Sequence, residues 1–177
     1  MIRLEIDDRE LQQALERLRS RVTDLSPVMR DIGELLVERA KQRFATSTAP
    51  DGTRWQPNAP ATILSYLERY GGTRRKDGGL SKRGASRAAG KKPLIGETKQ
   101  LMGTLYYQAG RDAVTVGSPM AYAAIHQFGG QAGRGRRVTI PARPFLPVTS
   151  SGQWLGEADR AAVLDILREA LEDAARG

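Results

Sequence analysis

Cysteine is absent from the chain, and histidine occurs only once, as His126. Without cysteine the protein forms no disulfide and offers no thiolate ligand, a composition typical of a reducing compartment. A metal site would have a single imidazole and would otherwise depend on carboxylates. The acidic residues gather on the surfaces of expected helices, where solvation and helix-end electrostatics account for them. No arrangement of a nucleophile and a base stands out, so we expect no catalytic residue, no metal and no cofactor.

Long hydrophobic runs are also missing, and none approaches the roughly 20 residues that cross a bilayer. The segment 1–7 lacks the basic and apolar regions of a signal peptide. No Gly-Lys-Ser/Thr motif is present, and the glycines of 129–133 follow an expected helix rather than a strand, so a phosphate-binding loop is not indicated. We therefore expect a protein that is made in the cytoplasm and has no contact with a membrane.

Acidic residues are scarce in one particular segment, residues 69–92. Nine of the 28 lysines and arginines lie there and Asp77 is the only acid, so the segment carries a charge of +8. The remaining 19 basic and 19 acidic residues cancel, so the whole excess of positive charge belongs to this segment. Its nine cations are Arg69, Arg74, Arg75, Lys76, Lys82, Arg83, Arg87, Lys91 and Lys92.

Large apolar residues are almost absent from residues 71–90, where Leu80 is the only one. Such a segment buries too little surface to offset its ordering entropy, so we expect a long mobile loop. The segment could neutralise the phosphates of a nucleic acid, or it could fold on an acidic protein surface. Its charge could also serve only to keep the loop solvated. Tyr70 is its one aromatic neighbour, and this scarcity of aromatic rings argues against base stacking. A second basic loop follows at 131–137, with Arg134, Arg136 and Arg137.

Hydrophobic periodicity predicts helices near both ends of the chain and a small sheet between them. The expected elements are a strand over 2–7, a helix capped by Asp7 or Asp8 and running to Leu25, a helix from its cap Ser26 to Phe44, a short helix over 62–70, a turn or helix capped by Thr98, a hairpin of 106–109 and 113–116, a helix from Ser118-Pro119 to Phe128 that ends at Gly129-Gly130, a strand over 138–140, an extended sheet edge around Phe145-Leu146, and a helix over 157–175. We expect one α+β domain over 1–177, in which 2–45 and 157–175 supply the main helices and 93–150 the small, mainly antiparallel sheet.

Three single residues need an interpretation. Trp55 and Trp154 each lie near a proline or glycine, and we interpret each as an anchor that pins a loop to the core rather than as a platform for bases. We expect His126 to be a packed, hydrogen-bonded helix residue rather than a metal ligand.

Three stretches of the chain carry a family resemblance. They are Phe44 with 50–55, Pro57 and Thr62; then Leu94-Ile95 with Thr98 and Leu101, leading to 114–118; and, as the most specific, 122–130 followed by 140–146. In this order and spacing the chain resembles the phage virion morphogenesis family, which includes the tail-completion proteins of Mu-like phages. The motif residues, to which we assign structural roles, are Trp55, Tyr122, His126, Phe128, Gly129, Arg143, Pro144 and Phe145.

The resemblance implies a structural protein of the virion at the head–tail junction, assembled in the host cytoplasm. Proteins of the neck form homo-oligomeric rings, often six-fold to match the tail, and dock on a tail terminator and on head-completion or connector proteins. The two basic loops could then reach a partner ring or packaged DNA, and the segment 142–145 would offer an extended edge to a neighbouring subunit. Two rival hypotheses remain: a free nucleic-acid-binding protein that uses 69–92 and, more weakly supported, an enzyme that acts on cell wall or DNA.

Overall fold

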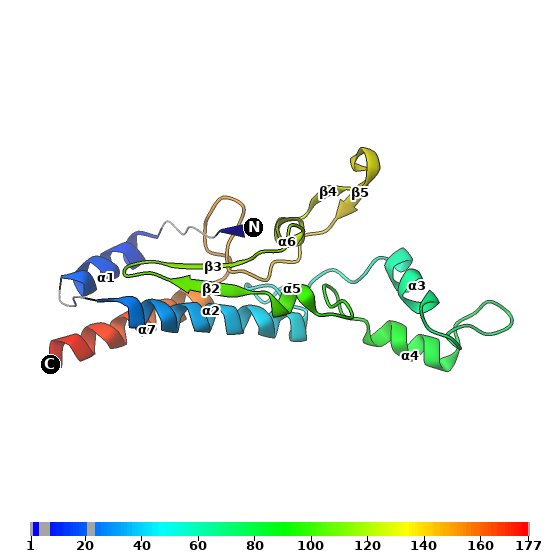
Figure 1. Cartoon of the computed structure of the whole chain (residues 1–177), viewed down its shortest axis with the longest axis horizontal. Helices are drawn as coiled ribbons and strands as arrows, with labels where there is room; N and C mark the ends of the chain where they lie inside the picture. Colours follow the sequence, from blue (N-terminus) through cyan, green and yellow to red (C-terminus); the bar gives the residue numbers. More distant parts are fainter. Residues whose placement is uncertain (1, 4–7, 21–23, 177) are drawn as a thin grey trace.

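The computed structural model describes residues 2–3, 8–20 and 24–176 and shows an elongated molecule with three parts (Figure 1). The body holds the N- and C-terminal helices and a small sheet. The ribbon (residues 130–140) projects from one side of the body, and the arm (residues 58–97) forms one end of the molecule. The fold is α+β, as the sequence predicts.

The body contains α1 (Arg9–Arg19), α2 (Ser26–Thr46), α5 (Gln100–Gly103), α6 (Ala123–Phe128), α7 (Glu157–Arg176), β1 (Ile2–Arg3), β2 (Tyr106–Ala109) and β3 (Val114–Ser118). The arm contains α3 (Pro60–Glu68) and α4 (Lys82–Gly90), and the ribbon contains β4 (Gly130–Ala132), the 3-10 turn η1 (Arg134–Arg136) and β5 (Val138–Ile140).

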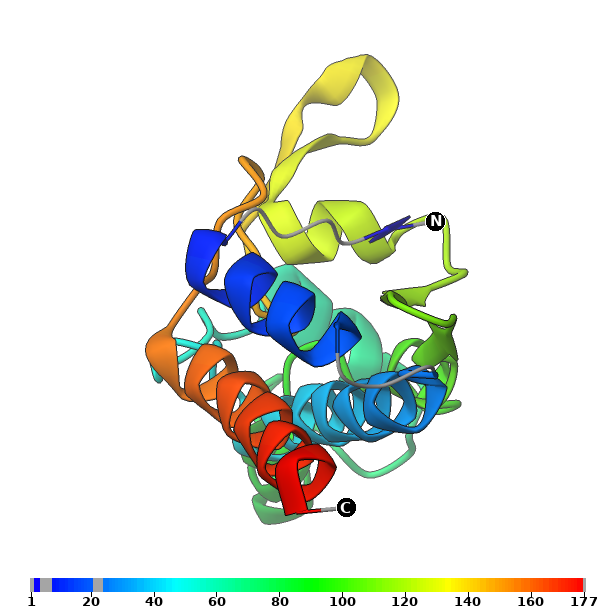
Figure 2. The ribbon, with the colours of Figure 1, turned by 90° about the vertical axis from the view of Figure 1, so that its left-hand side faces the viewer.

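The longest helix of the body, α2, packs on the hairpin of β2 and β3 and also against α7, while α1 lies on α7 (Figure 2). The sheet is antiparallel with strand order β1-β3-β2, and Tyr106 pairs with Gly117 and Ala109 with Val114. The predicted hairpin is therefore confirmed. Of the predicted N-terminal strand, β1 pairs with β3, and the rest of that strand lies outside the described residues.

The two N-terminal helices begin where the sequence indicates, but only one has the predicted cap. Asp8 caps α1, because its Oδ1 accepts from the backbone N–H of Glu10 at 3.0 Å and of Leu11 at 3.3 Å. The expectation that Ser26 caps α2 is wrong. Ser26 is the first helical residue, and its backbone N–H and its hydroxyl both donate to the side chain of Asp24.

An aromatic cluster closes the core of the body. Phe44 and Phe145 are fully buried, and the ring of Phe44 lies 5.4 Å from those of Trp55 and Phe145. The Nε1 of Trp55 donates to the carbonyl oxygen of Pro144 at 2.9 Å, so Trp55 is the loop anchor that the sequence predicts. The prediction of an extended sheet edge around Phe145 and Leu146 is wrong, because both side chains are buried and this part of the described chain forms no strand.

The arm is more ordered than the composition of 71–90 predicts, because α4 occupies its second half. Ser81 caps this helix, its Oγ accepting from the N–H of Gly84 at 3.0 Å. Gly84 packs on the backbone of Thr73 so closely that a Cβ would lie 2.0 Å from the Thr73 carbonyl oxygen. Thr73 is itself buried and donates to the carbonyl oxygen of Leu67. The scarcity of large apolar residues indicated a loop, but close backbone contact between small residues orders this part of the arm instead. The prediction of a mobile loop is therefore wrong for α4.

Three further element predictions need correction. The helix expected from Ser118-Pro119 is only α6, because Ser118 continues β3. The residues 131–137, expected to be a loop, contain part of β4 and the turn η1. Thr98 caps no helix, since α5 follows Lys99, whose backbone is left-handed with φ of 50°. In contrast, β5, the end of α6 at Gly129 and the C-terminal helix α7 agree with the predicted elements.

Candidate functional site

The predicted basic segment forms most of the arm, and several of its cations have partners inside it. The guanidinium of Arg87 lies 4.1 Å from the centre of the Tyr70 ring, and Arg69 pairs with Glu97 at 3.7 Å. The Tyr70 hydroxyl donates to the same carboxylate, which raises the pKa of Tyr70. Arg75 lies 3.6 Å from Asp77. These contacts order the arm without cancelling its charge.

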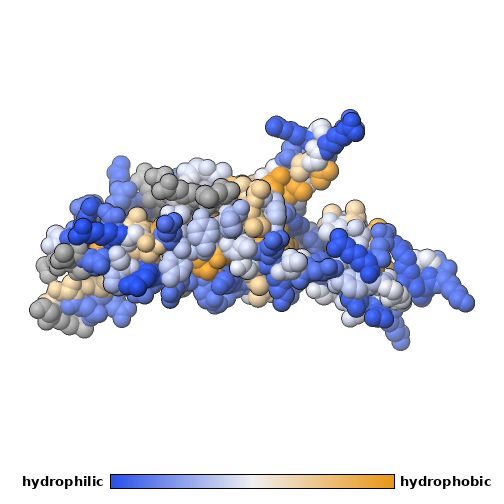
Figure 3. All heavy atoms as spheres, viewed as in Figure 1, coloured by the Kyte–Doolittle hydropathy of each residue, from blue (hydrophilic) through white to orange (hydrophobic). Residues whose placement is uncertain are grey.

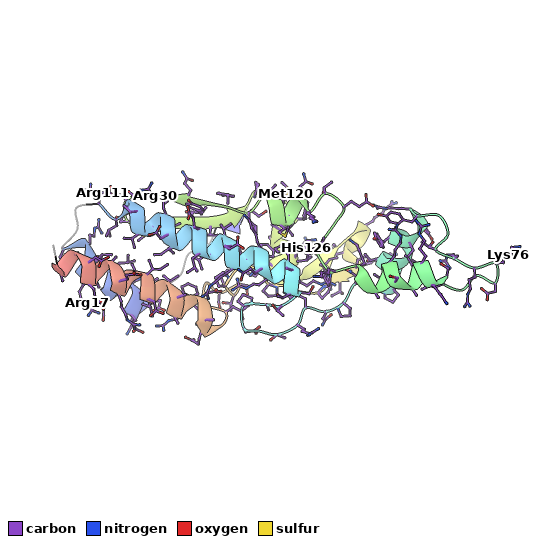
Figure 4. All side chains as sticks on the ribbon, turned by 90° about the horizontal axis from the view of Figure 1, so that it is seen from below. Arg17, Arg30, Lys76, Arg111, Met120 and His126 are labelled. Carbon is purple, nitrogen blue, oxygen red and sulfur yellow. The ribbon has the colours of Figure 1, made fainter. Side chains whose placement is uncertain are left out.

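The other cations of the arm fall into two groups. Lys76, Lys82 and Arg83 are exposed, and Arg74 donates only to the carbonyl oxygen of Gly78. Lys91 donates to the carbonyl oxygen of Ile95 within the arm, and Lys92 donates to the carbonyl oxygen of Ala45 on α2. Lys76 lies at the end of the molecule opposite to Arg17 and Arg30 (Figure 4).

The second predicted basic cluster stands on the ribbon. Arg134, Arg136 and Arg137 are all exposed around the turn that joins β4 to β5, where Arg136 has a φ of 54°. In the space-filling view the tips of ribbon and arm are both hydrophilic, while apolar residues gather at the base of the ribbon (Figure 3). The structure therefore does not bring the two predicted basic clusters together. They occupy two separate projections.

Gly129 sets the direction in which the ribbon leaves the body. Its φ is +74°, and a Cβ would lie 2.9 Å from the backbone nitrogen of Ala142. Only glycine accepts both this backbone conformation and this close approach. Phe128, the preceding motif residue, is 38% exposed at the base of the ribbon.

Gln127 is a key residue that sequence reasoning missed, although it stands within the most specific motif. Its side chain is 1% exposed and makes four hydrogen bonds to the backbone of the segment that holds Phe145. A signal was present: Gln127 follows Ala123 by four residues, so a polar side chain falls on the buried face of α6. Gln127 thus attaches 145–148 to α6.

A groove of about 610 Å³ separates the ribbon from the arm, and three of the motif residues line it. Tyr122 and His126 come from α6 and Arg143 from the segment after β5. The arm contributes Lys91, among other residues, to the opposite wall. The motif residues therefore divide among the aromatic cluster of the core, the base of the ribbon and this groove.

His126 is half-buried at the groove, and its Nδ1 has no hydrogen-bond partner among the described residues. The prediction of a hydrogen-bonded histidine is therefore wrong for this atom. The Tyr122 ring packs edge-on against the imidazole, with centroids 5.8 Å apart. Burial and the nearby charge of Arg143 lower the pKa of His126, and both causes favour the neutral imidazole.

Two features are absent from the part of the chain that the structure describes. No helix there is long and apolar enough to cross a membrane. No three histidine, aspartate or glutamate side chains there gather as a metal site would need.

Comparison with known proteins decides the family. The profile of the phage virion morphogenesis family matches residues 6–172. The chain belongs to this family. The predicted resemblance is thereby confirmed, and the protein has a structural or assembly role in a phage and is associated with the virion.

Two phage or prophage proteins are similar to this chain along most of their length. The Mu-like prophage FluMu G protein 2 of Haemophilus influenzae is 34% identical over 150 residues, which cover 84% of this chain and 86% of that protein. The putative capsid assembly protein G of Escherichia phage Mu is 30% identical over 167 residues, which cover 93% of this chain and 95% of that protein. No solved structure matches the chain significantly.

Proposed function

We propose that this virion morphogenesis protein completes the phage tail and joins it to the DNA-filled head at the neck. It acts as a docking subunit in a homo-oligomeric ring, six-fold where the ring matches the tail, and it is not an enzyme. Its partners are the tail terminator and the head-completion or connector proteins. The observation that carries the proposal is the pair of basic projections, arm and ribbon, on a body with a buried core (Figure 1). Such projections suit contact with neighbouring proteins better than enclosure of a substrate.

Deleting the gene from a prophage is expected to yield DNA-filled heads and separate tails that fail to join. The physical reason is that each half assembles on its own, and only the docking surface between them is lost. Electron microscopy of the induced lysate counts filled heads, free tails and joined particles, and adding purified protein to the lysate is expected to restore infectious particles.

Two outcomes contradict the proposal. Normal infectious particles from the deletion would show that the protein is dispensable for joining. A lysate without filled heads would show that the protein is needed before the head is filled with DNA. That result would favour a role in capsid assembly, the role that the name of the phage Mu relative states for that protein.

A second candidate function is sequence-independent binding of DNA along the arm. It is favoured by the exposure of Lys76, Lys82 and Arg83 in a segment whose only acid is Asp77. Such cations release counterions from phosphates, which makes the affinity depend steeply on salt. Replacing all three by glutamine is expected to lower the slope of log K against log salt by about 2–3, as fluorescence anisotropy with a DNA duplex would measure.

The matched control replaces Arg9, Arg17 and Arg30, three exposed arginines of the body, by glutamine. The net charge changes equally, so a slope that depends on charge alone would fall as much as in the arm variant. Equal slopes in the two variants, or no binding at low salt, would exclude the arm as a DNA-binding element.

A further inference from the structure

The groove between ribbon and arm has an unusual balance of charge. Three cations line it, Lys91, Lys92 and Arg143, and no carboxylate is among its described lining residues. The rest of its wall is partly aliphatic, with Leu94, Ile95 and Ile140 among the lining side chains. In the body, by contrast, the buried Arg43 is paired with the buried Asp159. The groove therefore attracts negative charge to a partly apolar surface.

Arg143 is the strongest indication that an anion belongs here. Its side chain is 7% exposed, and its Nε and Nη2 donate to the carbonyl oxygens of Gln56 at 2.9 Å and Pro57 at 2.8 Å. Within the described residues it has no carboxylate partner, and burial alone lowers the pKa of its guanidinium. Arg43 is as deeply buried, but Asp159 compensates its charge. A buried cation without a counterion is a costly arrangement unless a ligand completes it.

The ribbon adds a backbone feature to the same groove. Strand β5 pairs with β4 along one edge, and no described strand pairs with its other edge. All three residues of β5 line the groove, and Val138 is 53% exposed. A free strand edge offers backbone donors and acceptors to an added strand, and aliphatic side chains beside it favour alternating apolar residues in that strand.

We propose that the groove binds an extended segment of a partner virion protein that alternates aliphatic and acidic residues. The segment adds to the free edge of β5 and places a carboxylate against Arg143. This inference deepens the proposed function, on which it rests, by naming the chemistry of the docking partner.

Charge and exposure favour an acidic protein segment over a nucleic acid or a second copy of this chain. A nucleic acid would meet the exposed cations of the arm and the ribbon tip more readily than a guanidinium that is 7% exposed between aliphatic walls. The exposed charge on the arm and ribbon tip of a second copy is positive, so neither would fill this groove, and the proposed ring closes through other surfaces of the body. An acidic partner protein has neither disadvantage.

The test pans a displayed library of random dodecapeptides on the purified full-length protein. The enriched peptides are expected to carry aspartate or glutamate between aliphatic residues. Enrichment is expected to fall by about tenfold or more on the variant Lys91→Glu, because a like charge then faces the carboxylate. The control Lys82→Glu makes the same charge change on α4 outside the groove and is expected to bind as the unmodified protein does.

A second variant, Arg143→Lys, keeps the charge but loses the planar fork, and is expected to reduce enrichment as well. Thermal melting of each variant separates lost binding from lost folding, and Lys91→Glu carries the conclusion if Arg143→Lys unfolds. Enrichment without acidic residues, equal enrichment on Lys91→Glu and Lys82→Glu, or no enrichment would each overturn the proposal. The proposal would also be overturned if a DNA duplex displaced the peptides, or if the protein self-associated through the groove and Lys91→Glu abolished that self-association. The panning uses purified protein and no phage particles, so it tests the groove separately from the joining of heads and tails. Either experiment can fail while the other gives its expected result.

Discussion

Replacing Asp159 by alanine is expected to destabilise the protein by about 3–5 kcal/mol, because it leaves a buried arginine without its counterion. Asp159 is 1% exposed and pairs with Arg43, whose side chain is 9% exposed, and with Arg39 at 3.2 Å. Arg43 also donates to the carbonyl oxygen of Phe145 at 2.9 Å, so this charge joins α2, α7 and the aromatic cluster. Urea unfolding, followed by circular dichroism, measures the difference in the free energy of unfolding.

The matched control is Asp165→Ala on the same helix. Its carboxylate also pairs with an arginine, Arg168, but is 70% exposed, so almost no change in stability is expected. Equal stability of the two variants would show that burial of the pair at Asp159 does not matter. A double replacement, Asp159→Leu with Arg43→Met, removes both charges and is expected to recover much of the loss.

The sequence predicts those parts of the fold whose signals are local. The cap at Asp8, the hairpin around 110–112 and the end of α6 at Gly129 each depend on a few neighbouring residues, and each is confirmed. The arm shows the limit of such signals. There the order of α4 comes from backbone contact between Gly84 and Thr73, which no hydrophobic pattern reveals. Whether the rest of the segment 69–92 is mobile stays a prediction.

The candidate site shows a second limit. The charge of the arm and of the ribbon tip is read directly from the sequence, but the partner of each charge is not. Neither Arg43 nor Arg143 has an acidic residue within three positions in the sequence, and only the fold gives a counterion to Arg43 and leaves Arg143 with backbone carbonyls. The groove therefore depends on long-range contacts between 56–57, 91–95, 122–126 and 138–143.

Replacing Gln127 by leucine is expected to cost about 3–5 kcal/mol of stability, since several buried backbone groups lose their only observed side-chain partner. The Oε1 accepts from the N–H groups of Phe145 and Leu146, both at 2.9 Å. The Nε2 donates to the carbonyl oxygens of Leu146 at 2.9 Å and Val148 at 3.0 Å. Leucine fits the volume but satisfies none of these groups, so the segment 144–148 should detach first. Hydrogen exchange at the Phe145 and Leu146 amides reports this directly.

Two further variants show whether the hydrogen bonds, rather than the shape, matter at Gln127. The control Gln131→Leu removes an exposed glutamine that bonds only to Thr139, and is expected to leave both stability and exchange unchanged. Gln127→Glu keeps the acceptor but turns an anion toward two carbonyl oxygens, which raises the pKa of the new carboxyl in the folded state. Its protonated form donates one hydrogen bond where the amide donates two, so this variant is expected to regain part of the lost stability as the pH falls from 7.5 to 5. Equal losses for Gln127→Glu at both pH values would mean that packing, and not the donor to Leu146 and Val148, holds the segment on α6.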